Sequence, residues 1–471
     1  MSSPLTISPE ALQDAALGIF TSALDACNIA SAFDRHLHFE GNTLVLHPSP
    51  VIAPESIDLD RFKKVFVVAF GKAALTMTEA LIARLPRKSG VQGVCSAPLV
   101  PKKHPRGIHY FAGGHPLPNK ESFAAAKATL NLLSHAGKDT FVFFLISGGG
   151  SAMHELPLDK HISLNDTVAF HEALVASGAT ITEINTVRKY FSAVKGGRLA
   201  LAAPLAEKLS FLLADVPLKD LAAVASSPTL PDNSTPEQAR EILARYHLIE
   251  KFPRPVREFF LRLHLDPGAA PSIESAKPVA ARSKKTVDPA VAFGGSRFDT
   301  LLSNHDFVNA ARDCAQERGF RVVIDNTCDD WDYLDAASYL LKRFHELRDE
   351  YPRLCLLSSG EVTVKLGANP GCGGRNQQFA LACALDLARF EGQKLAVLSA
   401  GSDGIDGDSP AAGAIADTTT VSRARSFGFD PEQTLARFDT CTLFTALGDT
   451  VMTGPTGNNL RDLRVLLAVR E

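Results

Sequence analysis

A loop that could bind an anion lies at residues 371–378, where the sequence reads Gly-Cys-Gly-Gly-Arg-Asn-Gln-Gln. Glycine lets backbone N–H groups approach a ligand closely, and the Arg375 guanidinium presents a planar fork that matches a phosphate or a carboxylate. The run at 379–385 has helical composition, so we expect the loop at a helix N-terminus, where the helix dipole favours negative charge. A strand-to-helix turn with a surface arginine is the alternative interpretation.

Two further turns carry similar chemistry. Lys72 follows an apolar run and precedes a helix-like segment, so its ammonium could reach a phosphate beside that helix. A surface lysine whose stem covers apolar groups is the alternative. Residues 147–151 read Ser-Gly-Gly-Gly-Ser, and their consecutive N–H groups could form a nest around an anion. A flexible turn has the same composition.

Cations and carboxylates follow at several points. Residues 186–198 contain four cations, among them Arg188 and Lys195, and a solvated helix face is the alternative interpretation of this stretch. Asp215 and Asp403 each come directly after an apolar run. A carboxylate at a strand end can hold Mg²⁺ or act as a base, and it can equally cap a turn.

Apolar runs that are typical of buried strands precede these turns. They occupy residues 64–70, 141–146, 354–357 and 395–400, and each is followed by glycine or serine and then by a helix-like segment. Continuous apolar strands of this kind favour a parallel sheet covered on both faces. Ligands bind such sheets beyond the carboxyl ends of the strands. The sequence therefore predicts an α/β fold with the polar turns at one edge of a sheet.

The chain has 471 residues, of which 45% are hydrophobic, which is enough for two or three domains. Hydrophobic periodicity is lost between residues 265 and 289, where proline, alanine and lysine are frequent. We therefore predict an N-terminal domain at 1–270, a linker at 271–289 and a smaller C-terminal domain at 290–471. The net charge of −3 gives no electrostatic reason to expect nucleic acid or an anionic membrane as a partner.

The eight cysteines form no C-x-x-C pair, which favours a reduced cytoplasmic protein without a structural zinc site. No apolar run approaches the length of a membrane span, and the polar N-terminus indicates no signal peptide. The P-loop pattern G-x-x-x-x-G-K-[ST] does not occur in the sequence. The oligomeric state is left open.

Nine different short motifs are spread along the chain. They lie at residues 71–73, 115–119, 147–152, 185–189, 195–198, 359–364, 373–377, 402–407 and 454–457. In this order they resemble the class II glycerate 2-kinases, a two-domain family whose C-terminal module is called MOFRL. The resemblance runs from about residue 66 to 467. It implies ATP- and Mg²⁺-dependent phosphorylation of D-glycerate to 2-phosphoglycerate. The implied fold is a Rossmann-like α/β/α N-terminal domain and a smaller α/β MOFRL domain, with the active site in the cleft between them.

By the same resemblance Lys72, Arg375 and Asp403 are the catalytic candidates. Cations would stabilise the charge on the transferring phosphoryl group, and Asp215 or Asp403 would hold Mg²⁺ or orient the acceptor hydroxyl. The sequence does not choose between these two aspartates. The residues expected to bind substrate or nucleotide are Gly71, Ser147, Gly148, Gly149, Gly150, Ser151, Arg188, Lys195, Asp215, Glu361, Gly374, Asn376 and Asn459.

Three alternative functions remain. The segment after Asp215 departs most from the family pattern, because Leu218 and Lys219 replace a Gly-Asp-like pair, so the acceptor could be another small hydroxy acid. Some members of the family are called hydroxypyruvate reductases, which use NAD(P)H, although the dinucleotide fingerprint G-x-G-x-x-G is absent here. The third alternative is a non-enzymatic ligand-binding module. It is disfavoured because binding alone does not need acidic and basic side chains at several strand ends.

Overall fold

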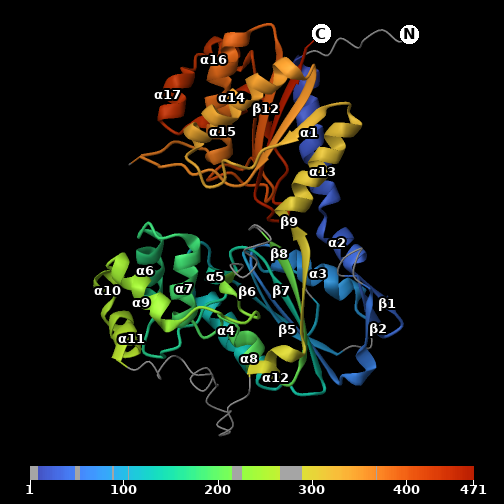
Figure 1. The fold of residues 1–471 in the computed structure, drawn as a ribbon, viewed down its shortest axis with the longest axis vertical. Coiled ribbons are helices and arrows are strands. Elements are labelled where there is room, and N and C mark those ends of the chain that lie inside the picture. The colour runs from blue at the N-terminus through green and yellow to red at the C-terminus, as the bar shows by residue number, and fades with distance from the viewer. Residues whose placement is uncertain are drawn as a thin grey trace. The chain divides into compact units, whose positions relative to one another are not determined.

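The computed structural model describes residues 9–47, 53–86, 90–103, 105–214, 225–265, 289–367 and 369–470. The chain forms two compact units. The central unit is Ile29–Leu301, and the C-terminal unit combines Met1–Asn28 with Leu302–Glu471. Each unit has its own six-stranded sheet and its own helices (Figure 1).

The sheet of the central unit has the strand order β6-β5-β4-β7-β8-β9. Its first five strands pair in parallel, as the apolar runs at 64–70 and 141–146 predict. Every residue of β7 is buried, because helices cover both faces of the sheet. The strands are β4 (Lys64–Phe70), β5 (Val91–Ala97), β6 (Ile108–Ala112), β7 (Thr140–Ile146), β8 (Glu207–Ala214) and β9 (Ser296–Ser303).

Helix α3 packs on β4 and β5, and helix α4 packs on β5 and β6. A second group of helices forms its own aromatic core on one side of the central unit, where Phe170 stacks on Phe191 with ring centroids 4.0 Å apart (Figure 1). Within this group, the Thr180 hydroxyl caps α7 and Glu183 bonds back to the Thr180 N–H. The helices are α3 (Ala74–Arg84), α4 (Lys120–Leu133), α5 (Gly150–Met153), α6 (Leu164–Val175), α7 (Ile181–Phe191), α8 (Arg198–Ala202), α9 (Pro236–Arg245), α10 (Leu248–Lys251), α11 (Arg254–Leu265) and α12 (Pro289–Gly294).

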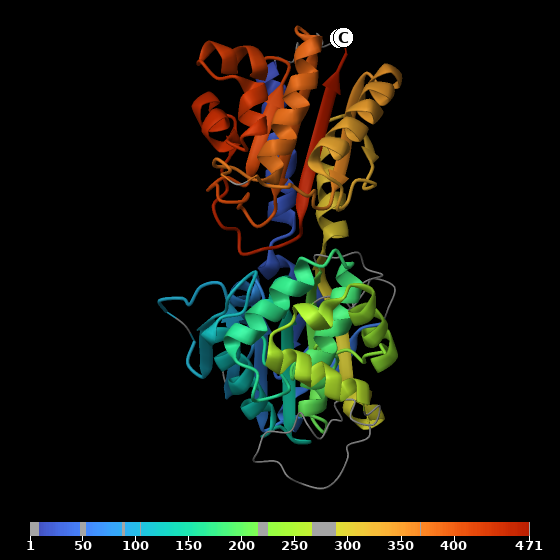
Figure 2. The same cartoon turned by 90° about the vertical axis from the view of Figure 1, so that its left-hand side faces the viewer.

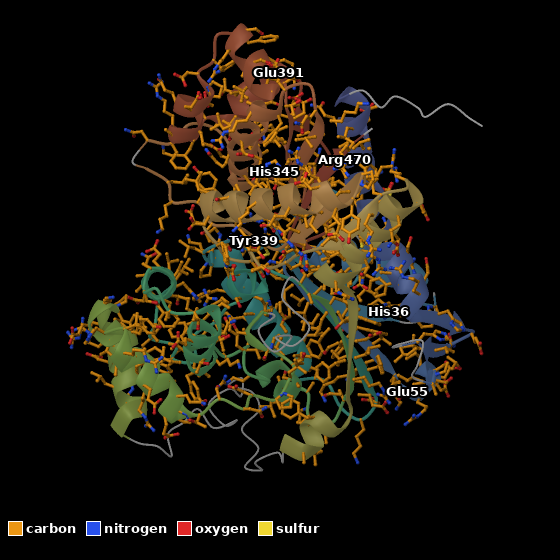
Figure 3. All side chains as sticks on the ribbon, turned by 45° about the horizontal axis from the view of Figure 1, so that its top comes forward. His36, Glu55, Tyr339, His345, Glu391 and Arg470 are labelled. Carbon is orange, nitrogen blue, oxygen red and sulfur yellow. The ribbon has the colours of Figure 1, made fainter. Side chains whose placement is uncertain are left out.

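A small antiparallel sheet completes the central unit. It contains β1 (Leu37–Glu40), β2 (Thr43–Leu46) and β3 (Glu55–Asp58), with α2 (Ile29–His36) before it and the 3-10 turn Leu59–Arg61 after it. Two ion pairs join this part to β9. His36 Nδ1 lies 2.6 Å from Asp299 Oδ2, and Arg297 Nε lies 2.6 Å from Glu55 Oε1 (Figure 3 labels His36 and Glu55).

The sheet of the C-terminal unit is mixed, with the order β10-β11-β15-β12-β13-β14. Only β10 and β11 are a parallel pair; β15 is antiparallel to both β11 and β12 and lies between them. The predicted runs at 354–357 and 395–400 are therefore strands that run in the same direction but are not adjacent. The strands are β10 (Arg321–Ile324), β11 (Arg353–Ser359), β12 (Lys394–Gly401), β13 (Gly413–Asp417), β14 (Thr450–Val451) and β15 (Asp462–Val469).

Helices lie on both sides of this sheet (Figure 2). Helices α1 and α13 pack against each other, and α14 packs on α15, where His345 Nε2 lies 2.8 Å from Asp386 Oδ2 (Figure 3 labels His345). The helices are α1 (Pro9–Ala26), α13 (Asn304–Glu317), α14 (Tyr333–Glu350), α15 (Arg375–Leu387), the 3-10 turn η4 (Ala388–Phe390), α16 (Thr420–Ser426), α17 (Pro431–Ala436) and α18 (Thr440–Leu447).

The compact units divide the chain differently from the predicted domains. Helix α1 belongs to the C-terminal unit, where Phe20 meets Phe307 at a ring distance of 5.9 Å, and not to an N-terminal domain at 1–270. The boundary near residue 301 lies inside β9, not at residue 290. An apolar helix face shows that something covers it but not which sheet does, so sequence could not assign α1. The predicted linker at 271–289 lies outside the described residues except for Pro289.

Among the described residues no single helix is long and apolar enough to cross a membrane, although the broken pair α1 and α2 passes the same test of length and composition.

Candidate active site

Helix α15 begins at Arg375, as the glycine loop predicts, and its N-terminus already carries an anionic group of the protein itself. The Asp406 carboxylate accepts the backbone N–H groups of Asn376 at 3.0 Å and of Gln377 at 2.9 Å. Gly374 makes this contact possible, because a Cβ there would lie 2.3 Å from Asp406 Oδ1. Burial raises the pKa of Asp406 to about 7, although the two N–H donors oppose that shift.

The rest of the 371–377 loop is also engaged by carboxylates. The Cys372 N–H donates to Asp439 Oδ1 at 3.2 Å, and the Gly373 N–H donates to Asp408 Oδ1 at 2.8 Å. The sequence predicts an anion against this loop, and the anions found there come from the chain. These N–H groups are therefore not available to a ligand in the conformation described.

Arg375 is held by two carboxylates. Its Nε and Nη2 atoms donate to Asp462 at 2.6 and 3.0 Å, and Nη2 also lies 3.0 Å from Glu361 Oε1. Burial would raise the pKa of Asp462, but the Arg375 charge outweighs it and holds that pKa below its ordinary value. About a third of the Arg375 side chain (34%) is exposed, against 1% of Asp462. No sequence pattern singles out Asp462, which begins β15.

Arg375 and Glu361 also line a cavity of about 560 Å³ within the C-terminal unit. One part of its wall is apolar and is made of Val362, Val364, Leu366, Pro370 and Phe438. The glycines of the 371–374 stretch contribute another part. A cavity with an apolar wall and a few charged groups suits a small molecule that has one apolar and one charged end.

Asp403 lies in a loop beside this cavity's arginine. A Cβ on Gly401 would lie 3.2 Å from Asp403 Oδ1 and 3.3 Å from Asp462 Oδ1, so the two carboxylates flank the same backbone position. The 454–461 loop packs on this region, since the Leu460 N–H donates to Ser402 Oγ at 2.6 Å. Asn459 precedes Leu460 and is buried. The structure thus brings Arg375, Asp403 and Asn459 into one region of the C-terminal unit.

The Asn376 side chain is turned inward. Its Oδ1 accepts the Ser399 hydroxyl at 2.6 Å, and its Nδ2 lies 3.3 Å from Asp406 Oδ1. Asn376 is buried, so its amide supports the helix N-terminus.

In the central unit, Lys72 lies in the turn between β4 and α3, next to the 147–151 loop. The Lys72 N–H donates to the Gly148 carbonyl at 2.9 Å, and the Ala73 N–H donates to Ser147 Oγ at 3.1 Å. Gly71 has a φ of +120°, and a Cβ there would lie 2.5 Å from the Ser147 carbonyl oxygen. Two turns that the sequence treats separately therefore form one surface at the carboxyl ends of β4 and β7.

The 147–151 loop has unused N–H groups. The Ser147 N–H donates to the Phe70 carbonyl, and the Gly150 N–H donates to the Ser147 carbonyl at 3.3 Å. The N–H groups of Gly148, Gly149 and Ser151 find no acceptor in the part of the chain that the structure describes. This loop differs in that respect from the 371–377 loop.

Lys195 is buried and paired, rather than directed at a ligand. Its Nζ donates to Glu155 Oε2 at 2.6 Å, and Ser192 Oγ donates to Glu155 Oε1 at 2.5 Å. His171 Nε2 lies 3.1 Å from Glu155 Oε2. Burial lowers the pKa of His171 to about 4 despite this contact. Sequence reasoning did not select Glu155, because a single glutamate carries no motif.

Arg188 lies on α7, one turn after Asn185. Its Nη1 donates to Asn185 Oδ1 at 3.4 Å, and no carboxylate among the described residues pairs with it. Burial lowers the pKa of Arg188, and the charge of Glu155 opposes this effect.

Asp215 lies outside the described residues, so the expected pair of Asp215 and Asp403 stays a prediction. Across the described ranges, no group of three or more His, Cys, Asp or Glu side chains could hold a metal ion.

A parallel sheet that ends in the Lys72 and 147–151 turns, with a second unit that carries Arg375 and Asp403, defines a two-unit α/β protein built to handle small anions. Residues 15–261 match a domain of unknown function, DUF4147, and residues 354–462 match the MOFRL family. The predicted fold class, a Rossmann-like unit with a smaller MOFRL-type unit, is confirmed.

The chain is 34% identical to the glycerate 2-kinase of Pyrococcus horikoshii, over 86% of this chain and 87% of that protein. It is 33% identical to the D-glycerate 2-kinase of Thermotoga maritima, over 88% and 92%. A protein of Agrobacterium vitis named putative hydroxypyruvate reductase is 36% identical, over 85% and 86%.

The crystal structure of a glycerate kinase from Thermotoga maritima matches with a TM-score of 0.76 and 30% identity, over 98% of this chain and 100% of that one. The chain belongs to the glycerate kinase family that carries a MOFRL domain.

Proposed function

We propose that this protein is a kinase that transfers the γ-phosphoryl group of ATP to D-glycerate and forms 2-phosphoglycerate. The observation that carries this proposal is the contact between the Lys72 turn and the 147–151 loop. The Lys72 side chain lies beside this loop, because a Cβ on Gly149 would lie 3.3 Å from Lys72 Cγ. A lysine beside N–H groups that have no acceptor among the described residues suits phosphate oxygens. The names of the glycerate kinases that resemble this chain over most of its length support the choice of reaction.

The proposed step is an in-line displacement. The 2-hydroxyl oxygen of glycerate forms a bond to the γ-phosphorus, the bond from that phosphorus to the β,γ-bridging oxygen breaks, and ADP leaves with the electron pair. The hydroxyl proton passes to a carboxylate, for which Asp403 is the described candidate and Asp215 the other. Lys72 and the loop N–H groups stabilise the charge on the equatorial oxygens.

Arg375 serves this step with only part of its guanidinium. An arginine has five N–H donors, and Asp462 and Glu361 engage those on Nε and Nη2. The Nη1 donors are the ones left for a substrate oxygen, so Arg375 contacts the phosphoryl group with one nitrogen. The carboxylates fix the orientation of that nitrogen, which lowers the cost of reorganisation in the transition state.

Mg²⁺ usually reaches kinase sites with the nucleotide phosphates and takes one or two carboxylates together with waters. One of the two aspartates, Asp403 or Asp215, would hold Mg²⁺, and the other would then accept the hydroxyl proton. Bound there, Mg²⁺ would neutralise charge on the β- and γ-phosphates.

The reductase alternative has one observation in its favour, the name of the Agrobacterium vitis relative. A nicotinamide cofactor would need the G-x-G-x-x-G turn, which this sequence lacks. Thermal-shift measurements with ATP–Mg²⁺ and with NADH separate the two functions. Stabilisation by NADH alone, with oxidation of NADH by hydroxypyruvate, would replace the kinase proposal.

The direct test is an ADP-release assay with D-glycerate, L-glycerate, tartrate and hydroxypyruvate, with the phosphorylated carbon identified by NMR. We expect D-glycerate to give the highest kcat/KM and 2-phosphoglycerate as product. Lys72→Met should reduce kcat by roughly a hundredfold, the scale of losing one charge-stabilising donor. Lys64→Met is the matched control, because Lys64 begins β4, the strand before the Lys72 turn, and its Nζ donates to the His135 carbonyl at an exposed position. Equal kcat in both variants would remove Lys72 from the mechanism.

A further inference from the structure

Arg188 is a half-buried cation whose Nε is fully buried, and the described residues leave most of its hydrogen-bonding capacity unused. Among those residues its guanidinium donates once, from Nη1 to Asn185 Oδ1 at 3.4 Å. Its Nε is buried and has no partner within the described ranges. Neighbouring cations are fully engaged by comparison: Lys189 Nζ lies 3.0 Å from Asp232, and Lys195 Nζ lies 2.6 Å from Glu155. Arg188 is therefore the cation of this region that is best placed to receive an external anion.

The charges around Arg188 do not balance. Glu155 is the only described carboxylate whose charge acts on Arg188, and it already pairs with Lys195. His154 and His171 are neutral near pH 7, since burial lowers their pKa values to about 3 and about 4. Among the described residues, two cations and one carboxylate leave an excess of one positive charge. A partly desolvated charge without a counterion is unfavourable, so one negative charge would stabilise the described region.

A chain of neutral groups connects Arg188 to the open loop at 147–151. Ser226 Oγ donates to Asn185 Oδ1 at 2.9 Å, and Ser151 Oγ lies 2.9 Å from Ser226 Oγ. Ser226 has a φ of +60°, a left-handed conformation that serine rarely adopts, and its carbonyl accepts the Gly196 N–H at 3.1 Å. Strained backbone of this kind concentrates at functional sites. Arg188 is thus positioned relative to the loop by hydrogen bonds and not by an ion pair.

We propose that Arg188 binds the carboxylate of the acceptor and so selects hydroxy acids over uncharged polyols. This inference rests on the proposed kinase function. The excess of one positive charge matches a carboxylate better than the several negative charges of a nucleotide triphosphate, which would call for additional cations. The planar guanidinium can also grip both carboxylate oxygens, which fixes the direction of the adjacent hydroxyl.

The test compares D-glycerate with its uncharged amide, D-glyceramide, at saturating ATP. For the wild-type protein we expect kcat/KM to be at least roughly a hundredfold higher for D-glycerate, because a charge-assisted pair is lost with the amide. Arg188→Gln should reduce kcat/KM for D-glycerate by a similar factor, mainly through KM, and should leave kcat/KM for the amide and KM for ATP within about threefold. Lys189→Gln, at the adjacent residue, should keep the wild-type preference.

A binding measurement separates this inference from the kinase proposal. D-Glycerate without ATP should raise the Tm of the wild-type protein and of Lys189→Gln but not of Arg188→Gln. The unliganded Arg188→Gln variant should melt at or above the wild-type temperature, because an uncompensated, partly desolvated charge has been removed. If D-glycerate stabilises the protein through Arg188 but is not phosphorylated, the carboxylate site stands and the kinase proposal falls. Two results overturn the inference if D-glycerate is phosphorylated. In the first, Arg188→Gln still has a higher kcat/KM for D-glycerate than for D-glyceramide by the wild-type factor. In the second, Arg188→Gln lowers kcat/KM for both substrates by the same factor.

Discussion

The glycine-rich turns at 147–151 and 371–377 have similar composition but differ in whether their backbone N–H groups are hydrogen-bonded to the protein. In the C-terminal unit, carboxylates of the chain accept the N–H groups of the 371–377 loop and hold Arg375. In the central unit, the described residues supply no acceptor for three N–H groups of the 147–151 loop and no carboxylate for Arg188. A glycine turn with an arginine therefore indicates where an anion lies but not whether the protein provides it.

This difference separates a region built for rigidity from one built for exchange. Internal carboxylates stabilise the 371–377 loop permanently and orient Arg375 before any ligand arrives. In the central unit, the described residues leave a positively charged region that the proposed ligand would complete, and such a region lowers the stability of the unliganded state. Functional sites commonly show this opposition between stability and activity.

The largest effect that would test the comparison is expected from Asp462→Asn. The substitution leaves Arg375 without its main partner, and breaking a buried ion pair costs about 3 kcal/mol, the lower end of the usual range since Arg375 is partly exposed. Urea unfolding of the variant and the wild type measures this loss in the free energy of unfolding. Glu361→Gln is the control and should cost less than about 1 kcal/mol, because Glu361 is half-exposed. If the two variants were equally stable, Asp462 would not be the group that neutralises Arg375.

A smaller effect is expected from Gly374→Ala. The added Cβ would lie 2.3 Å from Asp406 Oδ1, so the carboxylate must move away from the N-terminus of α15. Loss of this cap together with overpacking should lower the free energy of unfolding by about 2 kcal/mol. Gly367→Ala is the matched control, since its Cβ would meet no atom within 4 Å. A wild-type Tm for Gly374→Ala would mean that Asp406 does not hold the helix N-terminus.

The last test of the comparison is a pH dependence in the central unit. His154 and His171 have pKa values lowered by burial to about 3 and about 4, whereas in the unfolded chain both titrate near 6.5. Below pH 6.5 the unfolded state therefore binds more protons, and stability falls as the pH falls from 6.5 toward 4. Each histidine contributes about 1.4 kcal/mol per pH unit.

His154→Phe isolates one of these contributions. The His154 ring stacks on Phe70 at 4.6 Å, and its two nitrogens have no partner in the described part of the chain, so phenylalanine can replace it. Urea unfolding at pH 7, 6 and 5 should give a smaller loss of stability for this variant than for the wild type. An unchanged pH dependence would show that the His154 ring is not buried as a neutral group.

Sequence patterns were sufficient for the strands that precede the glycine turns, because an apolar run bounded by glycine has few other interpretations. They placed the Lys72 turn and the 147–151 loop at strand ends but did not predict the contact between them, which follows from the parallel pairing of β4 and β7. They did not reveal that β15 separates β11 from β12. No glycine turn followed by a helix marks β15, and the pattern that identified the other strands is missing there.

The partners of the charged residues were the least predictable part of the site. Arg375 meets Asp462 across 87 positions of sequence, and Lys195 meets Glu155 across 40. A short motif containing a cation has the same appearance whether the charge faces water, a ligand or a distant carboxylate. For this reason Arg375 and Arg188 could both be selected from the sequence. The sequence could not show that a carboxylate pairs with Arg375 and that no described carboxylate pairs with Arg188.

The position of β15 has a consequence for biosynthesis. This strand is the last element of the chain, and it lies in the interior of its sheet, between β11 and β12. Helix α1, which is synthesised before every strand of this sheet, packs on β12 and β15. The central unit contains all of its strands by residue 303 and can fold while synthesis continues. The C-terminal unit must wait for β15, so during translation α1 has no finished sheet to cover its apolar face and depends on other surfaces to protect it.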